Sequence, residues 1–224
     1  MDKIRILFIG NSYTEYNNLP GMLQHLAASA GKPLETKMVT CGGKTLEWHC
    51  NNHETLDTIA EGGWEYVVLQ EFSTRPLEER EKMYDSAAFL DRRIKEVNAS
   101  TVLYLTWARQ DMPEMQAELD DAYINLGKML GAIIAPVGMA WWEANRTDPG
   151  SNLYAGDGSH PDITGTYLTA CIFFAALFDE TPVGLICGFR RQSDAIFMDI
   201  DKERAAFLQT VAWDTVQEFK KRNI

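Results

Sequence analysis

Cysteine is scarce in this sequence, and the four cysteines lie far apart along the chain. They are Cys41, Cys50, Cys171 and Cys187. No two of them form a C-x-x-C pair, and four scattered residues are too few for a disulfide framework. We therefore expect free, mostly buried thiols and no zinc site built on cysteine.

The sequence also lacks clustered positive charge and long apolar runs. Its formal net charge is −11, and its one basic cluster is Lys220-Lys221-Arg222. A nucleic-acid-binding surface needs a basic face, so we expect no nucleic-acid partner. No segment reaches the length of a membrane helix, and no apolar leader with a cleavage site precedes the first predicted strand. If Met1 is the natural start, we expect a cytoplasmic protein without membrane contact.

The chain is long enough for one domain with a full core, and we expect residues 1–224 to form a single domain. Short apolar runs alternate with segments of helical periodicity, which predicts a parallel sheet with helices on both faces. Residues 181–198 carry no readable periodicity, and the sequence leaves open whether they cover the site or form a subunit contact. The predicted strands are residues 4–9, 36–40, 65–70, 101–106 and 132–137.

A serine follows the first predicted strand. Gly10-Asn11-Ser12 ends an apolar run in small, turn-forming residues. This places the Ser12 hydroxyl at the carboxyl edge of the sheet, where open α/β folds bind ligands. Serine is also a favoured helix cap, so this residue alone leaves two interpretations open.

Near the other end of the sequence, Asp157 and His160 lie three residues apart in a predicted turn. A carboxylate beside an imidazole orients the ring through its Nδ1 hydrogen and stabilises the imidazolium form. The other ring nitrogen can then accept a proton from a hydroxyl, and Ser12 is the natural partner because both segments should lie at the same sheet edge. The sequence therefore predicts an activated serine nucleophile.

Acyl transfer also needs hydrogen-bond donors for the oxyanion that forms during the reaction. Three candidates lie at predicted strand ends: the backbone N–H of Ser12, the backbone N–H of Gly43 and the side-chain amide of Gln70. Glycine at position 43 allows the backbone to approach a substrate closely.

Three blocks of this sequence together resemble the SGNH (GDSL-like) hydrolases, over residues 4 to about 178. They are Gly10-Asn11-Ser12-Tyr13-Thr14, Gly42-Gly43-Lys44-Thr45 and Asp157-Gly158-Ser159-His160-Pro161. The resemblance implies a three-layer α/β/α fold with a five-stranded parallel sheet in flavodoxin-like strand order. It also implies esterase or related acyl-hydrolase chemistry without a metal or other cofactor.

By this match Ser12 is the nucleophile, His160 is the general base and then the acid, Asp157 orients His160, and Gly43 is an oxyanion donor. The sequence departs from the family pattern at two positions. Asn11 stands where the family usually has aspartate, and the family's oxyanion asparagine is missing after the third strand. Gln70 carries the same amide one methylene further out, and we expect it to take that role.

Other chemistry-bearing residues have two interpretations. Trp107 and Arg109 follow the fourth predicted strand; they either line the acyl or leaving-group pocket, or they serve as core filler and a surface ion-pair partner. His49 and His53 could share a helix face, but no third metal ligand is evident, and surface histidines are far commoner. Trp141 and Trp142 are expected to pack in the core.

These features predict a metal-independent serine hydrolase that cleaves a small-molecule or carbohydrate ester. A small acyl group, such as acetyl on a carbohydrate or similar polar alcohol, is favoured because the sequence shows no long apolar lid. Two alternatives stay open: an acyltransferase with the same triad, and a catalytically silent carbohydrate- or ester-binding protein of the same fold.

Overall fold

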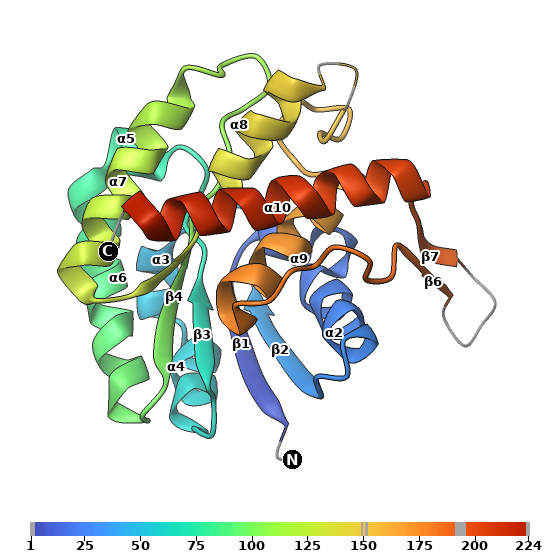
Figure 1. The fold of residues 1–224 in the computed structure, drawn as a ribbon. Coiled ribbons are helices and arrows are strands. Elements are labelled where there is room, and N and C mark those ends of the chain that lie inside the picture. The colour runs from blue at the N-terminus through green and yellow to red at the C-terminus, as the bar shows by residue number, and fades with distance from the viewer. Residues whose placement is uncertain (1–2, 149, 151, 191–195, 223–224) are drawn as a thin grey trace.

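The computed structural model describes residues 3–148, 150, 152–190 and 196–222 (Figure 1). Five parallel strands form one sheet in the order β2-β1-β3-β4-β5, flanked by helices on both faces. This confirms the predicted three-layer α/β/α architecture and its flavodoxin-like strand order. The strands are β1 (Ile4–Gly10), β2 (Leu34–Thr40), β3 (Tyr66–Leu69), β4 (Ser100–Tyr104) and β5 (Ile133–Ala135).

Alternating side chains of β1 point to opposite faces of the sheet, and each set packs in the hydrophobic core on its own face. Ile6 and Phe8 pack with α2, α8, α9 and α10, whereas Leu7 and Ile9 pack with α3, α4, α6 and α7. Figure 1 shows α10 lying across the outside of α9. The helices are α1 (Ser12–Glu15), the 3-10 helix η1 (Tyr16–Asn18), α2 (Leu19–Ser29), α3 (Leu46–Cys50), α4 (His53–Ala60), α5 (Arg75–Glu78), α6 (Arg80–Glu96), α7 (Met115–Leu130), α8 (Val137–Thr147), α9 (Ile163–Phe178) and α10 (Lys202–Arg222).

The chain reverses its direction of winding at β1. It passes from β1 to β2 on one side and then to β3 on the other, so β1 and β3 are neighbours at the topological switch point. Open α/β sheets bind ligands outside the carboxyl ends of the strands at this point. Ser12 immediately follows β1 and therefore lies at this position.

The segment without readable periodicity contains a second, two-stranded sheet. Strands β6 (Gly188–Arg190) and β7 (Ile196–Asp199) pair in antiparallel fashion. The preceding residues are held between α9 and α10, because the Tyr167 hydroxyl and the Gln209 amide donate hydrogen bonds to the carbonyls of Ile186 and Leu185. Residues 191–195 lie outside the described part of the chain, and both roles considered for this segment stay predictions.

Among the described residues, no helix is long and apolar enough to cross a membrane.

Candidate active site

A hydrogen-bonded chain joins the three residues predicted as a triad. Ser12 Oγ lies 2.8 Å from His160 Nε2, and His160 Nδ1 lies 2.5 Å from Asp157 Oδ2. Because the carboxylate can only accept, Nδ1 carries the hydrogen and Nε2 accepts from the serine hydroxyl. Residues 148 positions apart in the sequence thus form the arrangement that a serine nucleophile requires.

The turn before α9 shapes the Asp157–His160 pair. Asp157 Oδ1 accepts hydrogen bonds from the backbone N–H groups of Ser159 and His160, while Oδ2 faces the imidazole. The His160 contact and these two backbone donors lower the pKa of Asp157 to about 2. Its carboxylate therefore stays ionised across the neutral and mildly acidic range, and the exposure of about half of the side chain to water also favours the charged form.

Two tyrosines hold the His160 ring from different sides. The Tyr16 ring stacks on the imidazole at 4.3 Å between centroids, and Tyr13 meets it edge-on at 5.5 Å. The Tyr13 hydroxyl also lies 2.7 Å from Ser159 Oγ. No role was assigned to either tyrosine from the sequence. Tyr16 lies outside the family-like block at residues 10–14 and in no periodic pattern.

Asn11, and not Ser12, caps helix α1. The Asn11 Oδ1 atom accepts a hydrogen bond from the Tyr13 backbone N–H, and its Nδ2 donates to the Lys44 carbonyl at 2.8 Å. The Ser12 hydroxyl is therefore not used as a cap and is directed to His160. The capping role considered for Ser12 is thereby excluded, and its role as a nucleophile stays a prediction.

The Gln70 side chain is fully buried and holds the ends of β1 and β3 together. Its Oε1 accepts from the Asn11 backbone N–H (2.8 Å) and the Thr14 hydroxyl (2.9 Å). Its Nε2 donates to Asn11 Oδ1 (2.9 Å) and the Glu71 carbonyl (2.6 Å). Both amide hydrogens are thus donated within the protein, which corrects the expectation that Gln70 donates to an oxyanion.

The close approach of Gln70 depends on Gly10. A Cβ atom at position 10 would lie 2.5 Å from Gln70 Oε1 and 2.8 Å from Thr14 Oγ1, which is closer than real Cβ contacts. Gly10 in the Gly10-Asn11-Ser12 block is therefore required by this buried amide.

Two backbone N–H groups are candidates for binding an oxyanion. Among the described residues, neither Ser12 nor Gly43 donates its backbone N–H to another group. Gly43 is exposed and has φ +70°, a conformation that other residues adopt only with strain. Its missing side chain faces open space, so a substrate can approach this turn.

Two buried titratable groups, neither of which was expected to have this role, support this edge of the sheet. His49 is fully buried, and its Nε2 donates to the Gly10 carbonyl at 2.9 Å. This corrects the expectation of a surface histidine, and burial lowers its pKa. Glu71 Oε1 accepts the backbone N–H groups of Leu46 and Phe72, which connects the start of α3 to the end of β3.

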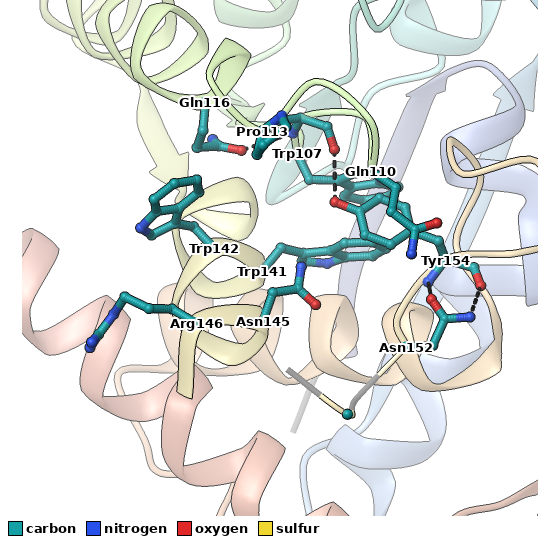
Figure 2. Close-up of a pocket in the computed structure, with 12 residues that line it drawn as sticks. Trp107, Gln110, Pro113, Gln116, Trp141, Trp142, Asn145, Arg146, Asn152 and Tyr154 are labelled. Carbon is teal, nitrogen blue, oxygen red and sulfur yellow. Dashed lines mark hydrogen bonds between the residues drawn. The ribbon is translucent and has the colours of Figure 1, made fainter. Parts of the chain in front are cut away.

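Trp107 lies in a stack of aromatic rings that runs from Tyr13, next to Ser12, to Trp141. Its indole stacks on Tyr13 at 4.6 Å and on Trp141 at 3.8 Å, and its Nε1 donates to the Ser159 carbonyl. Trp107 and Trp141 both line a cavity of about 430 Å³, shown in Figure 2. Trp107 is thus both a core residue and part of a cavity wall.

The cavity combines aromatic walls with amide side chains. Gln110, Asn145 and Asn152 contribute amides to its lining (Figure 2). The Gln110 backbone N–H donates to the Gly158 carbonyl, so the cavity adjoins the turn that carries Asp157 and His160. Trp142 lines the cavity with 48% of its surface exposed, which corrects the expectation that it packs in the core.

Arg109 lies between β4 and α7 and forms no ion pair with the described carboxylates. This is not the surface ion-pair role that one interpretation expected. Among the described residues, no cluster of three or more histidine, cysteine or acidic side chains is arranged to hold a metal ion.

No protein-family model and no curated protein matches the sequence. Solved structures do match. A candidate SGNH hydrolase from Slackia heliotrinireducens has a TM-score of 0.70 and 28% identity over 79% of this chain and 100% of its own. A DUF4886 family protein from Bacteroides uniformis has a TM-score of 0.76 and 21% identity over 96% of this chain and 95% of its own.

A third similar structure is the esterase EstA from a Pseudoalteromonas species, inhibited by monoethylphosphonate. It has a TM-score of 0.60 and 13% identity, covering 78% of this chain and 97% of its own. These likenesses and the strand order show that the chain has an SGNH (GDSL-like) hydrolase fold.

Gln70→Leu should destabilise the protein and lower its catalytic rate together. The substitution keeps the volume but leaves the buried Asn11 N–H and Thr14 hydroxyl without their acceptor, a loss of about 3 kcal/mol. Urea unfolding measures the first effect and ester turnover the second. Gln24→Leu on the exposed face of α2 is the matched control and should change stability by less than about 0.5 kcal/mol. Lost turnover with unchanged stability would instead favour direct oxyanion contact by Gln70.

Glu71 should make stability depend on pH. Burial raises its pKa to about 7, against an ordinary value of 4.5, so the folded state keeps a proton that the unfolded state has lost. Its contribution to stability is therefore present at low pH and falls as pH rises from about 4.5 to about 7. Relative to Glu71→Gln, the free energy of unfolding of wild type should fall by roughly 3 kcal/mol between these two pH values. Urea unfolding at several pH values checks this, and parallel curves for the two proteins would contradict it.

Proposed function

We propose that this protein is a serine hydrolase that cleaves an ester through an acyl-enzyme on Ser12. The observation that carries the proposal is the hydrogen-bonded chain Ser12–His160–Asp157 at the carboxyl edge of the sheet. The general class is supported by the likeness to SGNH and GDSL-like hydrolases.

In the first half of the reaction, Ser12 Oγ attacks the ester carbonyl carbon while its proton passes to His160 Nε2. The bond to the alcohol oxygen then breaks, and that oxygen takes the proton from His160 as the alcohol leaves. Asp157 holds Nδ1–H and stabilises the transient imidazolium. The product of this half is an ester between the acyl group and Ser12.

In the second half, water gives a proton to His160 and its oxygen attacks the acyl carbon. The bond to Ser12 Oγ breaks, Ser12 regains the proton from His160, and the carboxylic acid is released. The backbone N–H groups of Ser12 and Gly43 stabilise the oxyanion in both halves. Gln70 acts as a positioning residue, because it holds the Asn11 N–H and hence the turn that carries Ser12.

The substrate is an ester of a small acyl group, such as acetyl, with a carbohydrate or similar polar alcohol. This is supported by the cavity beside the Asp157–His160 turn, where amide side chains can bind hydroxyl groups and aromatic walls can pack on a sugar ring. Transfer of the acyl group to an alcohol would use the same residues, and added acceptor alcohols in the assay separate the two reactions. A silent binding protein would have no need for a base beside the Ser12 hydroxyl.

Ser12→Ala should abolish hydrolysis of p-nitrophenyl acetate, lowering kcat by about 10³-fold or more, because the nucleophile is removed. Turnover by wild type should persist in EDTA, and a fluorophosphonate probe should label Ser12. Ser29→Ala on the surface of α2 is the matched control and should retain full activity. Absence of both turnover and labelling in wild type would favour the binding-protein alternative.

The rate should fall as the acyl chain of p-nitrophenyl esters lengthens beyond a few carbons. This is expected for the small acyl group proposed above, which the absence of a long apolar lid in the sequence favours. A series from acetate to decanoate, measured as kcat/KM, checks this. A maximum at eight or more carbons would contradict a small acyl group while leaving the serine mechanism intact.

A further inference from the structure

Arg109 differs from the other arginines whose side chains are described. Most of them pair with carboxylates within 4.0 Å, namely Arg5, Arg75, Arg80, Arg93, Arg146, Arg204 and Arg222. Arg92 is unpaired but exposed on α6. Arg109 is unpaired and partly buried, and its Nε is shielded from solvent without a hydrogen-bond partner among the described residues.

No carboxylate of the described residues lies close enough to Arg109 to balance its positive charge. Its Nη2 lies 3.4 Å from Ser73 Oγ, which is a long and weak hydrogen bond. Desolvating a guanidinium without a counter-charge lowers the stability of the folded protein. A buried N–H donor that makes no hydrogen bond lowers that stability further. The chain as a whole carries net charge −11, so carboxylates to neutralise Arg109 are abundant in the sequence but are not placed beside it.

Arg109 belongs to the active-site edge. It follows β4, which lies next to β3, and β3 lies next to β1 and Ser12. The guanidinium also influences the Tyr13 hydroxyl electrostatically, and that hydroxyl contacts Ser159 beside His160. With neighbouring strands about 4.8 Å apart, the ends of β1 and β4 are separated by roughly 10 Å. A flexible arginine side chain can reach over part of that distance.

We infer that Arg109 binds a carboxylate carried by the ester substrate, several bonds away from the carbonyl that Ser12 attacks. This inference rests on the proposed ester hydrolysis and narrows its substrate to an anionic ester. A guanidinium pairs with a carboxylate through two parallel hydrogen bonds, and in Arg109 the two Nη groups, which are not sealed from solvent as Nε is, are the donors for such a pair. The carboxylate can belong to the acyl part or to the alcohol part of the ester.

Two pairs of esters test the inference and separate these two sources. For the acyl part, mono-p-nitrophenyl glutarate is compared with its neutral methyl ester. For the alcohol part, 4-acetoxybenzoate is compared with methyl 4-acetoxybenzoate. In wild type at low ionic strength, the anionic member of one pair should have at least about tenfold higher kcat/KM than the neutral member. The preference should weaken as salt is added.

Arg109→Gln should reduce the anionic-to-neutral ratio for that pair to near one, and Arg109→Lys should retain part of it. Arg93→Gln on the surface of α6 makes the same change in net charge and should keep the wild-type ratio. An equal loss for anionic and neutral esters in Arg109→Gln would overturn the inference, because it would indicate a merely structural role. A wild-type ratio near one in both pairs would also overturn it.

Failure of the proposed hydrolysis gives a different result from failure of this inference. If wild type cleaves none of the four esters and fluorophosphonate does not label Ser12, the proposal of a serine hydrolase is contradicted. If the neutral esters are cleaved with no preference for the anionic ones, the hydrolase stands and the role of Arg109 is rejected.

Discussion

The reciprocal amide contact between Asn11 and Gln70 is the interaction on which the geometry of this site depends. Each side chain is buried, and each satisfies its polar atoms with groups from a different strand end. Buried amides are costly unless their hydrogen bonds are made, so β1, β3 and the turn after β2 must keep their relative positions. The turn that carries Ser12 and the turn that carries Gly43 are thereby held in one arrangement.

The two sides of the site are built in different ways. The Ser12 side is supported by buried groups, including Gln70, Glu71 and His49. The His160 side is a partly exposed turn, held locally by Asp157 and covered by Tyr16. A rigid buried side suits oxyanion stabilisation, which depends on donors fixed before the reaction begins. An accessible imidazole suits exchange of the leaving alcohol for water.

The contact between Asp157 and His160 could be predicted from the sequence because it is local. Asp157 and His160 lie in one turn, and their residue types alone imply a carboxylate-oriented imidazole. Gln70 was assigned to the oxyanion because an amide at a strand end can donate there; its partner Asn11 is 59 positions away in sequence, and no pattern links them. The unpaired state of Arg109 was equally invisible, because ion pairing depends on which carboxylates the fold brings near.

The alternation of strands and helices, the parallel sheet and the position of Ser12 at its carboxyl edge could all be predicted from the sequence, because hydrophobic periodicity and turn residues act over short stretches of chain. The sharing of buried space among polar groups became known from the folded structure alone. Both hydrogens of the Gln70 amide go to protein acceptors, His49 is buried with its Nε2 donating to the Gly10 carbonyl, and Arg109 has no carboxylate partner among the described residues. These outcomes follow from the satisfaction of desolvated polar groups, which depends on neighbours distant in sequence.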